Sequence, residues 1–379
     1  MEFNLTGVIN LNPEQTLMSS SLPFTAIDTD LFPANYASSR QRWLAELGGE
    51  MLCFSYPCPG AGPEGEALFT DTVWIGLEDA AKVLVLIAGT HGIEGFAGSA
   101  IEIDVLRLLA GGQIVLPANT AVLMVHALTP WGYAWLRRCD ADGVDLNRNV
   151  VDFSRPLPEN AGYEILKYAL FSSNAQQRKI AFADFEQLHG REELEKAISA
   201  GQYCDPAGPF YGGSAPAHGR LVVEDLMRKY SLQQRDLAVI DLHTGLGSFG
   251  YGEIICDHQP DSPATKVACL WYGDSVTLPL LGTSSSVPKL GLLDYAWHAI
   301  MNERSCYITL EFGTYRTDQL FDVLLRDHQL WAQSDNDLAR REHSQLMRRH
   351  FCPDDQAWKE MVLFRARQVL SQAMRGLSG

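Results

Sequence analysis

Residues 81–95 read AKVLVLIAGTHGIEG, an apolar run that passes directly into a glycine-rich segment with one histidine and one glutamate. The run is almost continuously aliphatic, which is typical of a strand buried on both faces. Similar runs follow at residues 121–128 (AVLMVHAL), 236–244 (DLAVIDLHT) and 305–314 (SCYITLEFGT). Together they predict the central strands of a largely buried sheet.

Helical patterns alternate with these strands. They lie at residues 36–49, 98–111, 220–230, 317–333 and 356–375. This alternation predicts an α/β fold, in which a mixed, mostly parallel central sheet is flanked by helices. Residues 1–35 are predicted to form an irregular N-terminal arm and residues 36–379 a single domain. Within that domain, residues 150–220 are less regular and are interpreted as an elaboration over one face of the sheet.

Composition narrows the classes of partner. The 379 residues are 46% hydrophobic and carry a formal net charge of −16, which disfavours binding to nucleic acid or to an anionic membrane. Eight cysteines without a CxxC pair are typical of reduced thiols. The first basic residue is Arg40, and no apolar run reaches 18 residues, so we expect no secretory signal and no transmembrane helix. These features predict a cytoplasmic protein, while its oligomeric state is unknown from the sequence.

Polar side chains gather at the carboxyl ends of the predicted strands. The first strand is followed by His91 and Glu94, the third ends with Asp241 and His243, and the fourth carries Glu311 near its end. The loop after the second strand adds further polar residues: Arg137, Arg138, Asp145, Asn147 and Arg148. Ligand sites of open α/β sheets form at this edge, so we expect these groups to lie close together.

A metal site is one interpretation of this pattern. Two histidines, one carboxylate and an open position suit catalytic zinc, and the three-residue spacing of His91 and Glu94 lets both converge on one ion with the distant His243. Taken alone, however, the His91–Glu94 pair is more often a tight glycine-rich connection, and His243 a strand-end histidine bonded to backbone. Glu311 is harder to explain structurally, because a carboxylate among apolar strand residues is costly to bury.

Two other catalytic classes fit the sequence less well. The segment GTHGIEG lacks the GxGxxG pattern and the GK[ST] ending of phosphate-binding loops, and Glu94 would repel phosphate. The chain contains no GxSxG motif of the kind that presents a nucleophilic serine.

Five motifs in chain order resemble the zinc carboxypeptidase superfamily, the carboxypeptidase A-like M14 metallopeptidases. They are HGIE (91–94), LTPWGYAWLRR (128–138), GVDLNRN (143–149), DLHTG (241–245) and TLEFGT (309–314). Further stretches are similar to the bacterial DUF2817 branch: LFTDTVWIG, GTHGIEGFAGSA, GQYCDPAGPFYGG and DLHTGLGSFGYGE. The resemblance covers about residues 35–335. It implies a zinc-carboxypeptidase-like (phosphorylase/hydrolase-like) fold, with residues 36–379 as the catalytic domain.

The resemblance also implies a metal centre. His91, Glu94 and His243 match the ligands of one zinc ion per chain, and Glu311 matches the general base that activates the zinc-bound water. This agrees with general chemistry, because zinc lowers the pKa of water towards ~7 and a nearby carboxylate can take the proton.

The loop after the second strand would complete the site. Arg138 matches the arginine that stabilises the oxyanion, with Arg137 as its rival because the loop length differs. Asn147 and Arg148 match the pair that binds a substrate's terminal carboxylate, a task that suits the planar guanidinium group. Asp145 matches the aspartate that orients the first ligand histidine, as a carboxylate behind a metal-bound imidazole does.

Some family features differ. Ile93 stands where the digestive carboxypeptidases carry arginine, and Thr129-Pro130 replaces their Asn-Pro. The family's mobile tyrosine has no clear match; Tyr251, Tyr272 and Tyr295 are candidates. The substrate subsites are therefore less well predicted than the metal centre.

The function predicted from these motifs is zinc-dependent hydrolysis of an amide or peptide bond next to a free carboxylate. A carboxypeptidase acting on small peptides is the first form. An aspartoacylase-like N-acyl amino-acid deacylase is the alternative with the same metal centre. A binding protein that keeps the fold but has lost catalysis is the alternative from another class.

Overall fold

The computed structural model describes residues 26–48, 51–172, 174–333 and 337–379. Residues 1–25 of the predicted N-terminal arm lie outside these ranges. Within them, every helix is too short or too polar to cross a membrane.

The core of the fold is one eight-stranded sheet with the order β1-β2-β4-β3-β5-β8-β6-β7. The strands are β1 (Leu52–Ala61), β2 (Ala67–Ile75), β3 (Lys82–Ala88), β4 (Thr120–His126), β5 (Asp236–Gly245), β6 (Gly252–Ile255), β7 (Val276–Thr277) and β8 (Cys306–Gly313). The central strands β4, β3, β5 and β8 run parallel to one another. The pairs β1–β2, β2–β4 and β8–β6 are antiparallel, and the edge strand β7 pairs parallel with β6. The predicted mixed, mostly parallel sheet is confirmed.

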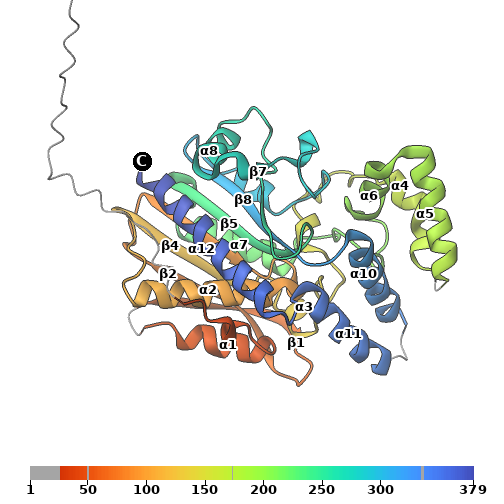
Figure 1. The fold of residues 1–379 in the computed structure, drawn as a ribbon, viewed down its shortest axis with the longest axis horizontal. Helices are drawn as coiled ribbons and strands as arrows, with labels where there is room; N and C mark the ends of the chain where they lie inside the picture. Colours follow the sequence, from red (N-terminus) through yellow and green to blue (C-terminus); the bar gives the residue numbers. More distant parts are fainter. Residues whose placement is uncertain (1–25, 49–50, 173, 334–336) are drawn as a thin grey trace, which may run out of the picture.

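Helices cover both faces of this sheet (Figure 1). They are α1 (Tyr36–Ala45), α2 (Gly95–Ala110), α3 (Pro130–Ala134), α4 (Ala161–Leu170), α5 (Ala175–His189), α6 (Arg191–Ser199), α7 (His218–Lys229), α8 (Pro263–Tyr272), α9 (Asp294–His298), α10 (Thr317–Trp331), α11 (Asp337–Phe351) and α12 (Gln356–Ser378). Helices α1, α2, α8 and α12 contribute to one apolar layer, and α7 and α9 to the other. Helices α4, α5 and α6 group together at one side of the molecule.

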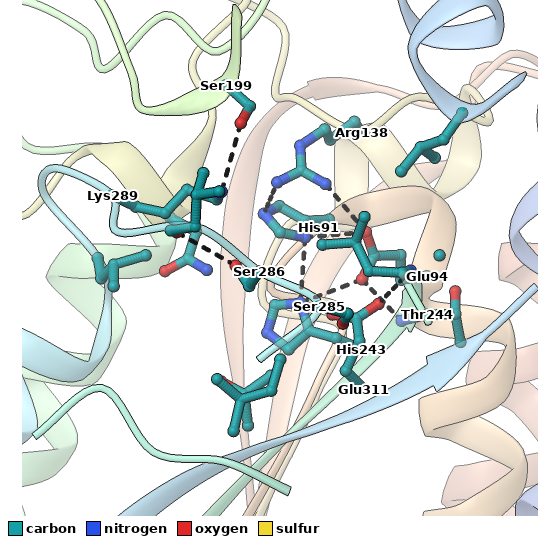
Figure 2. A pocket seen from close by; sticks show the side chains of 18 of the residues that line it. His91, Glu94, Arg138, Ser199, His243, Thr244, Ser285, Ser286, Lys289 and Glu311 are labelled. Carbon is teal, nitrogen blue, oxygen red and sulfur yellow. Dashed lines mark hydrogen bonds and ion pairs between the residues drawn. The ribbon is translucent and has the colours of Figure 1, made fainter. Parts of the chain in front are cut away.

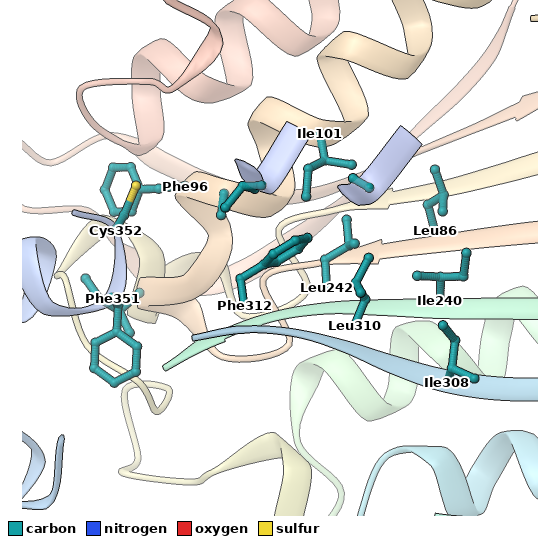
Figure 3. Packing of buried hydrophobic residues seen from close by; sticks show 14 of the residues in the cluster. Leu86, Phe96, Ile101, Ile240, Leu242, Ile308, Leu310, Phe312, Phe351 and Cys352 are labelled. Carbon is teal, nitrogen blue, oxygen red and sulfur yellow. The ribbon is translucent and has the colours of Figure 1, made fainter. Parts of the chain in front are cut away.

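The two layers follow from the two-residue period of a strand. Even-numbered residues of the central strands, such as Leu86, Ile240 and Leu310, pack against α2 and α12 (Figure 3). Odd-numbered residues, such as Val85 and Val239, pack on the opposite face against α7. Because successive side chains point to opposite faces, a strand that is apolar at every position is buried on both sides.

The four predicted strands are β3, β4, β5 and β8, with ends within two residues of the expected ones. The hairpin of β1 and β2 was not predicted. Strand β1 lies at the edge of the sheet and contains Pro57 and Pro59, residues that weaken a strand pattern and are tolerated at an edge. The edge position therefore accounts for the two prolines in this strand.

Candidate active site

The strand register brings the polar strand ends together. Strand β5 lies between β3 and β8, with Ala88 opposite Leu242 and His243 opposite Glu311. His91 follows β3 by three residues and begins a short 3-10 helix, η2 (Gly92–Glu94). All three elements therefore deliver side chains to the same edge of the sheet, as the sequence predicts.

Glycines shape the segment that holds His91 and Glu94. Gly89 has a φ of 69°, a left-handed conformation that turns the chain as β3 ends. Gly92 has no room for a side chain, because a Cβ there would lie 2.2 Å from the carbonyl carbon of Gly132. Close packing of η2 on α3 thus fixes where Glu94 points.

Three side chains present donor atoms to one point (Figure 2). The Nδ1 atom of His91 lies 2.9 Å from a carboxylate oxygen of Glu94 and 3.2 Å from Nδ1 of His243. Nδ1 of His243 lies 3.1 Å from the other Glu94 oxygen. A tetrahedral ion with bonds of about 2.0–2.1 Å holds its donors roughly 3.3 Å apart. The spacing and the nitrogen and oxygen donor set both fit zinc.

A carboxylate lies behind each imidazole. Nε2 of His91 lies 3.1 Å from Asp145, and Nε2 of His243 lies 2.7 Å from Asp241. Such partners fix the orientation of ligand histidines. Burial opposes protonation of His243, but the charges of Asp241 and Glu94 raise its pKa well above the ordinary value.

Asp241 had no predicted role, although its position offered a signal. It stands two residues before His243 on the same strand, so both side chains lie on one face of the sheet. It is fully buried and accepts hydrogen bonds from the hydroxyls of Thr90 and Tyr307, both 2.7 Å long. These bonds hold the carboxylate in place beneath the imidazole.

Glu311 lies beside this cluster on β8. One of its oxygens accepts a 2.9 Å hydrogen bond from the backbone N–H of Leu246. Burial, and then the negative charge of Glu94, raise the pKa of Glu311 to about 8. The residue is a pocket-lining carboxylate next to the donor atoms of His91, Glu94 and His243.

The two adjacent arginines point to different places. The guanidinium of Arg138 lies 3.2 Å from Glu94 and 2.9 Å from Asp145, so its positive charge sits beside the cluster. Arg137 instead pairs with Asp327 at 2.7 Å, and its guanidinium carbon lies 4.5 Å from the ring centre of Trp331. The structure therefore brings Arg138 to the pocket and places Arg137 in a separate buried pair.

Arg148 and Asn147 both line the pocket. Arg148 is buried and donates two hydrogen bonds to the carbonyl of Ser199, at 3.1 and 2.7 Å, and a third to the carbonyl of Asn147. The side-chain oxygen of Asn147 accepts a 2.7 Å bond from the N–H of Leu293. Backbone contacts thus set both side chains before any ligand enters.

The pocket beside the cluster has an empty volume of about 860 Å³, including its open mouth. Phe210 forms part of its wall, and its ring centre lies 5.3 Å from the guanidinium carbon of Arg138 and 5.5 Å from that of Arg148. Tyr307 lines the pocket as well. The candidate tyrosines 251, 272 and 295 are not among the described lining residues.

Several lining residues had no sequence signal. They are Ser199, Asp257, Ser285, Ser286, Lys289 and Asp294. They come from loops and short helices far apart in the chain, so only the fold brings them to this edge of the sheet.

A family model described as a protein of unknown function, DUF2817, matches residues 32–365. The chain belongs to the DUF2817 family. The match confirms the predicted branch and extends beyond residue 335, where the resemblance of the motifs ended. It therefore includes α11 and the first part of α12. No curated protein matches this DUF2817 chain.

Several solved structures are similar to this DUF2817 protein. Succinylglutamate desuccinylase from Chromobacterium violaceum is 16% identical, with 84% of this chain and 74% of that chain covered and a TM-score of 0.35. Thrombin-activatable fibrinolysis inhibitor is 10% identical, with coverages of 90% and 73% and a TM-score of 0.48. An aspartoacylase family protein from Mesorhizobium loti is 15% identical, with coverages of 76% and 68% and a TM-score of 0.36. Matches this distant transfer no activity to the chain.

Proposed function

We propose that this protein is a zinc-dependent hydrolase that cleaves an amide bond next to a free carboxylate, with small peptides as the first class of substrate. One observation carries the proposal. The donor atoms of His91, Glu94 and His243 lie 2.9–3.2 Å apart, with the Glu311 carboxylate beside them on the neighbouring strand.

His91, Glu94 and His243 would hold the ion. When bound, zinc supplies Lewis acidity, which polarises a carbonyl group and lowers the pKa of water. Asp145 and Asp241 keep the two imidazoles oriented so that Nδ1 of each faces the ion site.

The chain's own groups would handle the protons and the developing charge. Glu311 takes the proton of the attacking water and returns it to the leaving amine, because it is a buried carboxylate within the pocket. Arg138 places a positive charge beside the reacting carbonyl, where negative charge develops in the transition state. Arg137 has no part in this proposal, since its guanidinium pairs with Asp327.

Arg148 and Asn147 would bind the terminal carboxylate of the substrate. Arg148 uses three hydrogen bonds to carbonyl groups, which leaves two of its five N–H donors for a ligand. Its buried, preset guanidinium suits a carboxylate, since an anion would neutralise a charge that has little access to water.

The test compares two kinds of substrate on the full-length, zinc-loaded protein: an N-blocked dipeptide with a free carboxylate, and N-acetyl amino acids. We expect zinc-dependent cleavage of the dipeptide to be the faster reaction. Faster cleavage of the N-acetyl amino acids would assign the deacylase activity instead. A protein that holds zinc but cleaves neither class would overturn the hydrolase proposal in favour of a binding role.

A further inference from the structure

Lys289 is a pocket-lining cation that the proposed reaction does not use. The two residues that follow it are held by backbone hydrogen bonds: Leu290 N–H donates to the carbonyl of Ala200 at 2.9 Å, and the carbonyl of Gly291 accepts from Val150 N–H at 3.0 Å. Figure 2 shows Lys289 and Ser199 on one side of the pocket, and His91 and Glu94 on the other. These hydrogen bonds fix the backbone next to Lys289 in the wall of the pocket.

The ammonium group of Lys289 has spare donors. It donates one hydrogen bond, 3.3 Å long, to the hydroxyl of Ser199. Among the described residues, no carboxylate oxygen lies within the 4.0 Å of an ion pair with it. An ammonium group has three N–H donors, so two remain for a ligand.

Burial and the neighbouring arginines disfavour the charged form of Lys289. Burial, and next the positive charge of Arg148, lower the pKa of Lys289 to about 7; Arg138 acts in the same direction, while Asp257 and Glu195 oppose the shift. Lys289 is half-buried and lies near two arginines, so its ammonium group is poorly hydrated and repelled by like charge. A bound anion would stabilise the charged form, because it replaces the lost interactions with water.

Lys289 and Arg148 also share one residue. Arg148 bonds to the backbone carbonyl of Ser199, while Lys289 bonds to its hydroxyl. The two cations therefore lie side by side on one wall of the pocket. A ligand with two neighbouring anionic groups would match this pair, with one group on each cation.

We propose that Lys289 forms a second anion-binding subsite, and that the preferred substrate ends in an acidic residue with one carboxylate at its terminus and another on its side chain. This inference rests on the proposed hydrolase function, because it assigns the terminal carboxylate to Arg148 and Asn147. It adds the substrate class that this pocket selects.

The test uses three blocked dipeptides, acetyl-Ala-Glu, acetyl-Ala-Gln and acetyl-Ala-Lys, with the full-length zinc-loaded protein. We expect kcat/KM for the glutamate peptide to exceed that for its uncharged glutamine counterpart roughly tenfold or more, the size of one charge-assisted hydrogen bond. Equal kcat/KM values for the glutamate and glutamine peptides, or a preference for the lysine peptide, would overturn the proposal on the wild-type protein alone.

Variants then assign the preference to the residue. Lys289→Met should reduce the ratio of the two rates to about one, while Lys289→Arg should keep a preference for glutamate. Lys266→Met, which removes an exposed lysine on α8, is the matched control and should leave the ratio unchanged. An equal loss for both peptides in Lys289→Met would mean that Lys289 binds only the terminal carboxylate, and would also overturn the proposal.

Binding of the free amino acids separates this inference from the hydrolase function. Calorimetry should show tighter binding of glutamate than of glutamine to the wild-type protein, and no difference in Lys289→Met. If this holds while no peptide is cleaved, the hydrolase proposal fails and the subsite stands. If peptides are cleaved but neither rate nor affinity depends on the acidic side chain, the subsite fails and the hydrolase stands.

Discussion

Glu311 and the three proposed zinc ligands have tasks that single substitutions can separate. In Glu311→Gln, one oxygen can still accept the Leu246 N–H, but the side chain can no longer take a proton. We expect kcat to fall roughly a hundredfold or more, because general bases contribute about that much. Steady-state kinetics on a blocked dipeptide measures the loss, and zinc content should remain unchanged. Wild-type turnover in this variant would remove Glu311 from the mechanism.

Asp241 is expected to affect zinc affinity through His243, because it contacts this proposed ligand and is not itself one. Asp241→Asn removes the negative charge 2.7 Å from Nε2 of His243, so the imidazole becomes a weaker donor. Zinc affinity should fall roughly 10- to 100-fold, as for other partners of ligand histidines. Competition with a zinc-binding dye measures the affinity. Asp261→Asn, at an exposed loop position, is the control, and equal affinities in both variants would contradict the role of Asp241.

The titration of Lys289 should make the preference for the glutamate peptide depend on pH. Its pKa of about 7 means that Lys289 of the unliganded protein is charged at lower pH and loses the charge as pH rises through this value. Arg148 and Arg138 favour the loss; Asp257 and Glu195 oppose it. The ratio of kcat/KM for the glutamate and glutamine peptides should therefore be highest near about pH 6 and fall by about pH 8. In Lys289→Arg, the ratio should stay level over this range; a level ratio in the wild type would contradict the assignment.

At the scale of elements, the position of η2 depends on its contact with α3. In Gly92→Ala, the new methyl group would lie 2.2 Å from the carbonyl carbon of Gly132 and 2.3 Å from the backbone nitrogen of Tyr133, so one element must move. We expect a loss of about 1–3 kcal/mol in the free energy of unfolding, the usual effect of overpacking, together with weaker zinc binding because Glu94 moves.

Gly48→Ala is the control for this substitution, since a Cβ at Gly48 meets no atom within 4 Å. Urea unfolding measures the stability of both variants. Unchanged stability and zinc affinity in Gly92→Ala would show that the contact between η2 and α3 does not fix the ligand.

In the whole molecule, local sequence patterns predict the central strands and the side chains at their carboxyl ends. Four continuous apolar runs mark β3, β4, β5 and β8, because a strand buried on both faces must be apolar at nearly every position. The motifs likewise predict the convergence of His91, Glu94 and His243, since parallel strands share one carboxyl edge.

Two features, the edge strand β1 and the position of Lys289, depend on tertiary contacts and could not be predicted from the sequence. Strand β1 pairs with β2 although it contains two prolines, and no local sequence pattern indicates that pairing. Lys289 reaches the pocket because hydrogen bonds tie its segment to residues near Ala200 and Val150, which are distant in the chain. The proposed specificity thus depends on loops that only the fold assembles, while the proposed zinc ligands lie at strand ends that the sequence identifies.

The zinc content of the purified protein shows whether one zinc ion binds to His91, Glu94 and His243, as we propose. The purified full-length chain is dialysed against zinc and then against metal-free buffer, and zinc per chain is measured by atomic emission. We expect about one zinc per chain in the wild type and in Glu311→Gln, and close to none in His243→Ala, since a catalytic zinc site has three protein ligands. A wild-type protein without zinc, or a His243→Ala variant with as much zinc as the wild type, would show that these three residues do not form a zinc site.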